Sequence, residues 1–498
     1  MKKRIVSFTV VVALVITGIA GRLGYIMFSG SYTVSDSYNS YTLVLARKNP
    51  TLYYSNGERM TYNKYKYIAV FRPNSQTLYE IDKVYSHNEA KEITNELAKG
   101  YPVTREIDKN LKNKFSYVKT YKVYETENTC RQLVNKASSG LYKYLDSEDK
   151  LKINFTVDAK GRLLAGDEGT LIDDGYSSHK GLTLTIDEKI QQITYDACNN
   201  LESGCAIVMN VADGSILACV NKPDDTYINK CFSQYSAGSV FKIVVAACAL
   251  EGSLNPEYTC TGSVTVGDTV FSCQNDKRHG TQTLKQALAN SCNCYFVNLA
   301  LALGEDKILK ISKELGYSSK TYIYGSWSVD NAMLPDAKKL SSPGQLALFG
   351  FGQGSLTVTP MQICSTLCTV ANDGAMPTPH LIKNTVSENG TAQQVDYAIP
   401  NPVLAKSNAD KLMTYLRYVV TNGTAANAED EAKKSAGKTA TAQTGQYSDG
   451  KELLNTWFAG VYPYDNPQYA IVIMKENGSS GAGDCCPIFR SIVENLDN

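Results

Sequence analysis

The stretch YSAGSVFKIVVAACALEG, residues 235–252, organises the interpretation of the whole chain. Its opening YSAG can form a tight turn, because glycine adopts backbone conformations closed to other residues. The apolar run that follows predicts a helix that ends at Gly252 and has Ser239 at its amino end, one turn before Lys242. A serine hydroxyl with an amine one helical turn away is the start of a serine acyl-transfer site that needs no histidine.

The Ser-x-x-Lys spacing alone is weak evidence, because the chain repeats it elsewhere. The same spacing begins at Ser116, Ser147, Ser435 and Ser448. None of these serines follows a glycine turn and opens an apolar helix. The setting of Ser239, rather than the spacing, therefore selects it as the candidate nucleophile.

Two further motifs follow in order along the chain. SCN occupies Ser291 to Asn293, and KTAT occupies Lys438 to Thr441. A second serine paired with an asparagine, and a lysine-threonine pair on a strand, are the remaining parts of such an acyl-transfer site. The long interval between the second and third motifs leaves room for a helical subdomain.

The amino terminus predicts a membrane anchor. The basic residues Lys2–Arg4 precede an uncharged and mostly apolar run that continues past Arg22. The segment from Ile5 to about Tyr25 is long enough to span a membrane if the Arg22 side chain reaches the outer interface. About 20 helical residues span a bilayer. The competing interpretation is a signal peptide cleaved in the small-residue context around Ala20.

The organisation beyond the anchor predicts two folded domains. Residues 1–28 form the cytoplasmic tail and anchor, and residues 29–180, rich in Tyr, Lys, Asn and Glu, read as a mixed strand and helix module. Residues 181–498 contain all three motifs. Hairpin patterns near both ends of this last segment, with helical patterns between them, predict an α+β domain whose antiparallel sheet is flanked by helices.

Composition excludes several classes of function. The net charge of +1 gives no support for nucleic-acid binding, and no phosphate-binding glycine loop suggests a nucleotide cofactor. The four histidines, far apart in the chain, show no ligand spacing, and the 14 cysteines contain no paired CxxC arrangement. We therefore expect no metal and no cofactor.

The sequence suggests one disulfide, between Cys260 and Cys273. Cys260 and Cys273 flank the segment TGSVTVGDTVFS, which has the pattern of a β-hairpin. Because an exported chain can form disulfides, a bridge between these two residues is plausible on chemical grounds. Most of the other cysteines lie in apolar stretches, where a small buried side chain is the ordinary interpretation.

Several blocks together resemble the class B penicillin-binding proteins, which are monofunctional and membrane-anchored. The blocks are TLTIDEKIQQ, MNVADGSILACVNKP, SAGSVFK, HGTQTLKQALANSCNCYFVNLA, GFGQGSLTVTPMQ, GKTATAQTG and NTWFAGVYP, in family order from about Gly181 to the carboxyl terminus. The resemblance implies a five-stranded antiparallel sheet with a helical subdomain. For residues 29–180 it implies a pedestal or dimerisation-type domain.

The resemblance also implies roles for the motif residues. Ser239 is the nucleophile, Lys242 its general base, Ser291 a proton relay, and Lys438 a source of positive field. Asn293, Thr439 and Thr441 bind substrate, and the backbone amides of Ser239 and Thr441 form the oxyanion hole. Where the family has glycine after lysine-threonine, this chain has Ala440, for which we expect reduced β-lactam affinity.

The implied activity is a peptidoglycan D,D-transpeptidase that acts on stem peptides and is trapped by β-lactams. The resemblance places its catalytic domain outside the cytoplasmic membrane, on a single-pass anchor, with a membrane glycan polymerase of the shape, elongation, division and sporulation group as partner. Two alternatives remain open. One is a β-lactamase or D,D-carboxypeptidase, and the other is a catalytically silent scaffold or β-lactam sensor.

Overall fold

The chain divides into two compact units in the computed structural model. The first combines Met1–Lys48, Lys64–Glu125 and Asp149–Ser177, and the second combines Asn49–Asn63, Thr126–Glu148 and Ser178–Asn498. The structure describes residues 2–28, 39–48, 51–111, 114–128, 133, 141, 149–158, 160–224, 228–325, 327–429 and 434–496. The segments 49–63, 126–148 and 178–180, which the sequence analysis assigned to the pedestal, belong to the second unit. The predicted boundary between the anchor and the pedestal, at residues 28 and 29, falls where the described range 2–28 ends.

Helix α1, Lys2–Phe28, carries the apolar amino-terminal run. Its segment Phe8–Tyr25 has a mean hydropathy of 1.7, and none of it is buried against the rest of the chain. Within the described ranges it is the one helix long and apolar enough to cross a membrane, judged by length and composition. A single-pass anchor fits this helix.

The first unit contains two three-stranded sheets, β1-β6-β7 and β4-β3-β5. Successive side chains of strand β3 point alternately into two hydrophobic cores, one on each face of the strand. Its Ala69 and Phe71 face the core that includes Ile93 of α3, and its Ile68 and Val70 face the core shared with β1 and β6. The bounds are β1 Ser40–Lys48, β3 Thr61–Phe71, α2 Ser75–Ile81, α3 His87–Leu97, β4 Val103–Ile107, β5 Val118–Asn128, β6 Asp149–Thr156 and β7 Thr170–Asp174.

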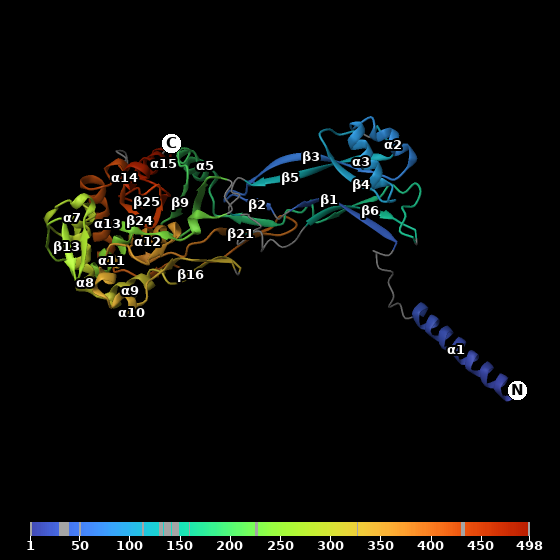
Figure 1. Cartoon of the computed structure of the whole chain (residues 1–498), viewed down its shortest axis with the longest axis horizontal. Helices are drawn as coiled ribbons and strands as arrows, with labels where there is room; N and C mark the ends of the chain where they lie inside the picture. Colours follow the sequence, from blue (N-terminus) through green and yellow to red (C-terminus); the bar gives the residue numbers. More distant parts are fainter. Residues whose placement is uncertain are drawn as a thin grey trace. The chain divides into compact units, whose positions relative to one another are not determined.

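A five-stranded sheet in the order β10-β9-β26-β25-β24 forms the centre of the second unit (Figure 1). Every pairing in it is antiparallel, as the sequence predicts. The two amino-terminal strands and the three carboxyl-terminal strands lie side by side and are joined where β9 pairs with β26, so both ends of the unit build one sheet. Strand β24, which carries the KTAT motif, is an edge strand. The bounds are β9 Gly204–Asn210, β10 Ile216–Lys222, β24 Ala436–Ser448, β25 Lys451–Tyr462 and β26 Tyr469–Lys475.

Helices cover this sheet, and a helical group follows the second motif. Helices α5 and α15 pack against each other and on the sheet. Phe489 of α15 and Phe458 of β25 make an edge-to-face contact, with their ring centroids 4.7 Å apart. Helix α12 packs on β9, β25 and β26, and it is buried from Pro360 to Val370. The bounds are α5 Glu188–Ala197, α6 Lys242–Glu251, α7 Leu284–Ala289, α8 Asn293–Leu303, α9 Glu305–Glu314, α10 Ala337–Leu340, α11 Pro343–Gly350, α12 Pro360–Ala371, α13 Lys406–Asn422, α14 Gly481–Asp484 and α15 Cys486–Leu496.

Short strands complete the second unit. A four-stranded sheet has the order β2-β8-β21-β22, and pairs such as β12-β15 and β13-β14 form small ribbons. The predicted hairpin between Cys260 and Cys273 is the pair β13-β14. The bounds are β2 Thr51–Tyr53, β8 Gly181–Leu184, β11 Tyr235–Ser236, β12 Tyr258–Cys260, β13 Ser263–Val266, β14 Thr269–Ser272, β15 Gly280–Gln282, β16 Lys320–Tyr324, β17 Trp327–Asp330, β18 Ala332–Met333, β19 Thr357–Val358, β20 Ala375–Met376, β21 Ile382–Val386, β22 Ala392–Gln394 and β23 Asn401–Pro402.

Asp484 fixes the loop that follows β26. Its Oδ2 accepts hydrogen bonds from the backbone amides of Ser479 and Ser480 at 2.7 and 2.8 Å, and from the Thr456 hydroxyl at 3.1 Å. Although burial acts to raise the pKa of Asp484, these hydrogen bonds and the charge of Lys475 hold that pKa below its usual value. A carboxylate stabilised in this way contributes to folding in its charged form.

We predict that Asp484→Asn destabilises the second unit by about 2 kcal/mol at pH 7, the scale of hydrogen bonds to a charged group. Because the folded pKa is depressed, this contribution is complete above the unfolded pKa of about 3.9 and disappears as the pH falls through the folded value. Thermal unfolding of both proteins should therefore differ at pH 7 and converge in acid.

Asp410→Asn is the matched control. Asp410 is exposed and pairs with Lys406 at 3.5 Å within one helix, so its loss should change the unfolding midpoint little at either pH. Equal effects of the two substitutions at pH 7 would show that the Asp484 contacts are not stabilising.

Candidate active site

Ser239 lies in a single 3₁₀ turn, Gly238–Phe241, that leads directly into α6. The helix ends at Gly252, as the sequence predicts. Gly238 has φ +56°, and its amide donates to the Gly352 carbonyl at 2.9 Å. A Cβ on Gly352 would lie 1.9 Å from the Gly238 carbonyl oxygen, so only glycine fits there. The GFGQG segment thereby fixes the turn that carries the serine.

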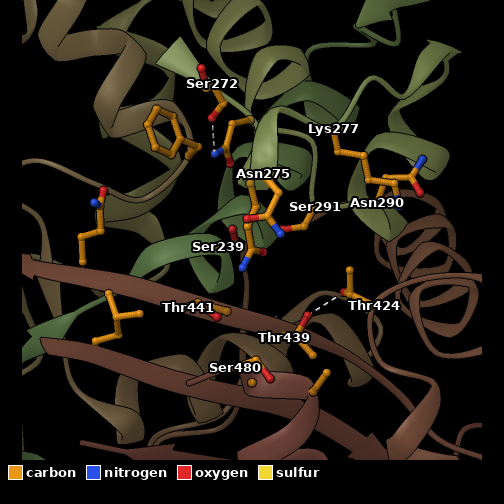
Figure 2. Close-up of a pocket in the computed structure, with 18 of the residues that line it drawn as sticks. Ser239, Ser272, Asn275, Lys277, Asn290, Ser291, Thr424, Thr439, Thr441 and Ser480 are labelled. Atoms are coloured by element: carbon orange, nitrogen blue, oxygen red, sulfur yellow. Dashed lines mark hydrogen bonds between the residues drawn. The ribbon is translucent and has the colours of Figure 1, made fainter. Parts of the chain in front are cut away.

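The same turn is pressed against the third motif strand. A Cβ on Gly238 would lie 2.8 Å from the Cβ of Ala442 on β24. Ser239 is half-buried and lines the cavity beside this strand (Figure 2). Within the described part of the chain, no hydrogen bond of its hydroxyl is recorded, which leaves the oxygen available to a ligand.

Lys242 is completely buried and connects the first two motifs. Its ammonium donates to the Ser291 carbonyl at 2.8 Å, to the Ser291 hydroxyl at 3.4 Å and to Asn293 Oδ1 at 2.7 Å. Asn293 Nδ2 in turn donates to the Ser272 carbonyl at 3.0 Å. Burial lowers the pKa of Lys242 to about 8, partly offset by the nearby thiols of Cys292, Cys273 and Cys294. An amine with that pKa is partly neutral near pH 7, as a general base requires.

Lys438 is also completely buried, and it is not one of the residues that line the cavity. Its ammonium donates to the Thr439 carbonyl at 2.8 Å. Burial, and then the charge of Lys242, hold the pKa of Lys438 well below its usual value. The charge of Lys242 therefore favours the neutral form of Lys438.

The cavity has a volume of about 720 Å³ and lies along β24. Ser239, Ser291, Asn293, Thr439 and Thr441 all line it, so residues from all three motifs meet in one place (Figure 2). Thr439 and Thr441 are two apart on a regular strand and project from the same face. Two hydroxyls on one face can bind a carboxylate or another acceptor group.

The sequence analysis did not select Thr424, which also lines the cavity. Its hydroxyl lies 2.6 Å from the Thr439 hydroxyl (Figure 2). The preceding Gly423 lets the chain approach α7, because a Cβ there would lie 2.4 Å from the Ala289 carbonyl oxygen. A Gly-Thr pair just after a helix end was the available signal, and only the fold shows that it reaches β24.

Ala440 is 3% exposed. It lies between Thr439 and Thr441, so strand alternation turns its methyl to the opposite face from their hydroxyls. Its backbone is approached by Gly481, where a Cβ would lie 2.8 Å from the Ala440 carbonyl oxygen. Ala440 is still one of the residues that line the cavity. Because its methyl is on the other face of the strand from the two hydroxyls, we expect its effect on ligands to come mainly through the position and backbone of β24.

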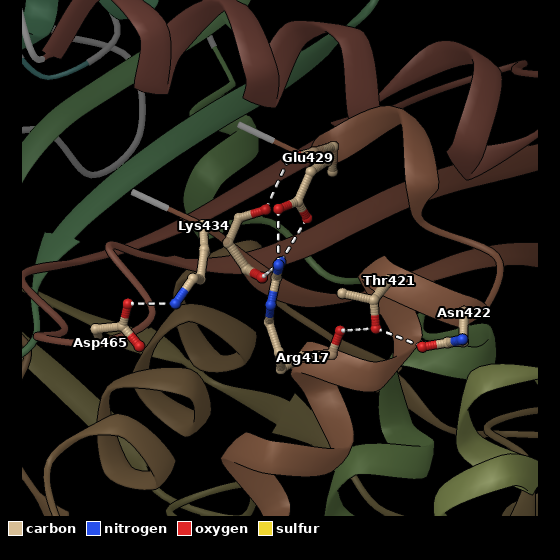
Figure 3. Close-up of polar contacts among 8 residues, drawn as sticks. Arg417, Thr421, Asn422, Glu429, Lys434 and Asp465 are labelled. Carbon is tan, nitrogen blue, oxygen red and sulfur yellow. Dashed lines mark hydrogen bonds and ion pairs between the residues drawn. The ribbon is translucent and has the colours of Figure 1, made fainter. Parts of the chain in front are cut away.

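Polar contacts hold the start of β24 (Figure 3). Arg417 on α13 donates to both carboxylate oxygens of Glu429 and to the Ser435 carbonyl at 2.8 Å. Lys434 pairs with Asp465 at 2.9 Å. Because Ser435 lies three residues before Lys438, these contacts help to fix the register of the motif strand.

The expected disulfide is not formed in the structure. The sulfur atoms of Cys260 and Cys273 lie 3.7 Å apart, well beyond the bond length of about 2.05 Å, and both residues are free thiols. The Cys273 sulfur also lies 3.7 Å from that of Cys292 and 3.5 Å from that of Cys294. Cys260, Cys273, His279 and Cys292 form a group that could hold a metal ion, although the sequence analysis expected none.

Comparison with known proteins identifies the family. The family model described as the penicillin binding protein transpeptidase domain matches residues 204–494, more than half of the chain. Stage V sporulation protein D of Bacillus subtilis is 29% identical over 376 residues, covering 69% of this chain and 57% of that protein. Peptidoglycan D,D-transpeptidase MrdA of Haemophilus influenzae is 26% identical over 367 residues, covering 63% and 56%. These matches span a little over half the length of the curated relatives.

Solved structures share the fold. Penicillin binding protein 3 of Mycobacterium tuberculosis, complexed with aztreonam, has a TM-score of 0.66 at 20% identity over 92% of this chain and 96% of that chain. The D,D-transpeptidase domain of a peptidoglycan glycosyltransferase from Eggerthella lenta has a TM-score of 0.65 at 21% identity over 91% and 98%. With the three motifs converging on one cavity and the family model covering the unit that holds them, this chain belongs to the penicillin binding protein transpeptidase family.

Proposed function

We propose that this protein is a peptidoglycan D,D-transpeptidase that works through an acyl-serine intermediate. The observation that carries the proposal is the buried Lys242 ammonium, which joins Ser291 and Asn293 one turn from the open hydroxyl of Ser239. This geometry supplies a nucleophile, a base of lowered pKa and a second hydroxyl without histidine.

In the proposed reaction, neutral Lys242 accepts the Ser239 proton while the serine oxygen attacks the carbonyl carbon of the penultimate D-alanine. The resulting oxyanion is stabilised by the backbone amides of Ser239 and Thr441. The carbon–nitrogen bond then breaks, and the terminal D-alanine nitrogen takes a proton through Ser291. Asn293 holds the donor peptide, and Thr439 with Thr441 binds its terminal carboxylate.

Deacylation reverses these roles. The amine of a neighbouring stem attacks the acyl-serine carbonyl, loses a proton to the Ser291 and Lys242 pair, and releases Ser239 with its hydroxyl restored. β-Lactams offer the same serine an acyl carbonyl whose leaving group stays attached, so the acyl-enzyme persists. The same chemistry therefore makes the protein a β-lactam target.

The proposal extends to location. Helix α1 would cross the membrane once, with Lys2–Arg4 inside, so that the catalytic unit lies outside the cytoplasmic membrane. Residues 29–180, apart from the segments that belong to the second unit, would serve as a pedestal, and the main part of the catalytic domain would begin near Gly181. A membrane glycan polymerase of the shape, elongation, division and sporulation group would supply the glycan strands that this enzyme cross-links.

The first test is covalent labelling of the full chain in detergent by a fluorescent penicillin. We predict labelling of the wild type and its loss in Ser239→Ala, with Ser116→Ala as a control that keeps it. A stem pentapeptide with and without an acceptor amine separates transpeptidation from hydrolysis. Labelling without any peptide turnover would favour the silent scaffold or sensor, and hydrolysis alone would favour a carboxypeptidase or β-lactamase.

The second prediction concerns pH. Because Lys242 must be neutral to accept a proton, and burial lowers its pKa to about 8, acylation should accelerate as the pH rises to about 8 and then level off. The charged or titratable groups around it are Lys438 and the thiols named above. Lys242→Gln should lower the acylation rate by about 10²- to 10⁴-fold and abolish this pH dependence. A rate independent of pH between 6 and 9 in the wild type would contradict the role of Lys242.

The third prediction concerns Ala440. Since its methyl does not project with the hydroxyls of Thr439 and Thr441, Ala440→Gly should raise the rate of β-lactam acylation by less than about tenfold, equivalent to about 1.4 kcal/mol. Stopped-flow acylation by a chromogenic β-lactam measures this rate. An unchanged rate in Ala440→Gly would refute the expectation that Ala440 reduces β-lactam affinity.

A further inference from the structure

Four side chains that are scattered in the sequence converge beside the active-site cavity. Cys260 ends β12, Cys273 follows β14, His279 precedes β15, and Cys292 caps the amino end of α8. One ligand atom from each lies within 4.8 Å of all the others, and the three cysteines are buried. We propose that these residues form a structural zinc site.

The spacing of the ligand atoms matches a tetrahedral ion. With metal–sulfur bonds of about 2.3 Å and metal–nitrogen bonds of about 2.0 Å, tetrahedral zinc holds two sulfurs about 3.8 Å apart and a sulfur and a nitrogen about 3.5 Å apart. Cys260 and Cys273 have their sulfurs 3.7 Å apart, as do Cys273 and Cys292. The Cys260 sulfur lies 3.5 Å from Nδ1 of His279.

The ligand set is also the right one chemically. Three thiolates and one imidazole form a set that binds Zn²⁺ in structural sites, where all four positions are protein ligands and no open position remains for water. Soft sulfur ligands favour zinc over magnesium or calcium, which prefer oxygen. The Tyr295 amide donates to the Cys292 sulfur at 3.4 Å, a contact that would stabilise a thiolate.

A disulfide explains the cluster less well. One bridge would use two of the cysteines and leave the third beside it, with no role for His279. Cys294 also lies 3.5 Å from Cys273, but its sulfur is directed to the Phe271 carbonyl at 3.9 Å and lies outside the group of four. The four-residue group is therefore the better ligand set.

The proposed ion would stabilise the second motif. Cys292 lies between Ser291 and Asn293, the two residues that bind Lys242, and Ser291 has φ +52°, a conformation that costs energy for a residue other than glycine. A bond from the metal to Cys292 would tie this strained turn to the β12-β15 ribbon. The ion would thus act on catalysis by positioning, without touching the substrate.

The test is metal analysis of the full chain, purified in detergent with reducing agent and without chelator. We expect one zinc per chain in the wild type, less than about a tenth of that in His279→Ala and Cys292→Ala, and an unchanged content in Cys198→Ala, another buried cysteine. Replacement by Co²⁺ should give the sulfur-to-cobalt charge-transfer absorption of a tetrahedral thiolate site, and His279→Ala should lose it.

Chelation of the wild type provides a test that needs no variant. Removing the ion should lower the unfolding midpoint by at least about 5 °C and slow penicillin acylation, and added Zn²⁺ should restore both. Ser239→Ala should keep its zinc, so the outcome is independent of the proposed acyl transfer. A reduced, folded wild type that binds neither zinc nor cobalt, a Cys260–Cys273 disulfide in peptide mapping, or zinc retained in both ligand variants would overturn the proposal.

Discussion

The buried ammonium of Lys242 is the constraint on which the arrangement of the active site depends. A cation without water must find oxygen partners, because an unpaired buried charge is very costly. Here the partners are the Ser291 carbonyl, in the loop between α7 and α8, and the side-chain amide oxygen of Asn293, the first residue of α8. The helix that carries the nucleophile is thereby connected to the helical subdomain at one defined point.

The sheet supplies the other side of the cavity. Strand β24 is an edge strand, so one side of it is free to meet the turn at Gly238 and, in the proposed reaction, a substrate backbone. Arg417 supports the start of this strand through the Ser435 carbonyl, and the loop held by Asp484 contributes Ser480 and Gly481 to the cavity wall. The Thr439 and Thr441 side chains of this strand line the cavity, where the Thr439 hydroxyl also contacts that of Thr424.

The proposed zinc site would make the stability of the loop before α8 bear on catalysis. If zinc binds at Cys260, Cys273, His279 and Cys292, the loop that holds Ser291 and Asn293 depends on a bound ion as well as on packing. Loops of this kind owe part of their order to the ligand and lose it when the ligand leaves. Acylation would then respond to the supply of zinc and to oxidation of the thiols.

The sequence by itself determined the family, the order of the three motifs, the helix from the Ser239 turn to Gly252 and the hairpins of the central sheet. Each of these depends on residues that are close together in the chain, so local periodicity, turn residues and motif spacing are enough to predict it. Tertiary structure alone decided what depends on contacts between distant residues. It placed Thr424 against Thr439, turned the Ala440 methyl to the opposite face of β24 from the two threonine side chains, and assigned residues 49–63 to the second unit. It also brought His279 to three cysteines that lie 13 and 19 residues apart along the chain. Strand pairing rather than sequence spacing sets the distance between those side chains.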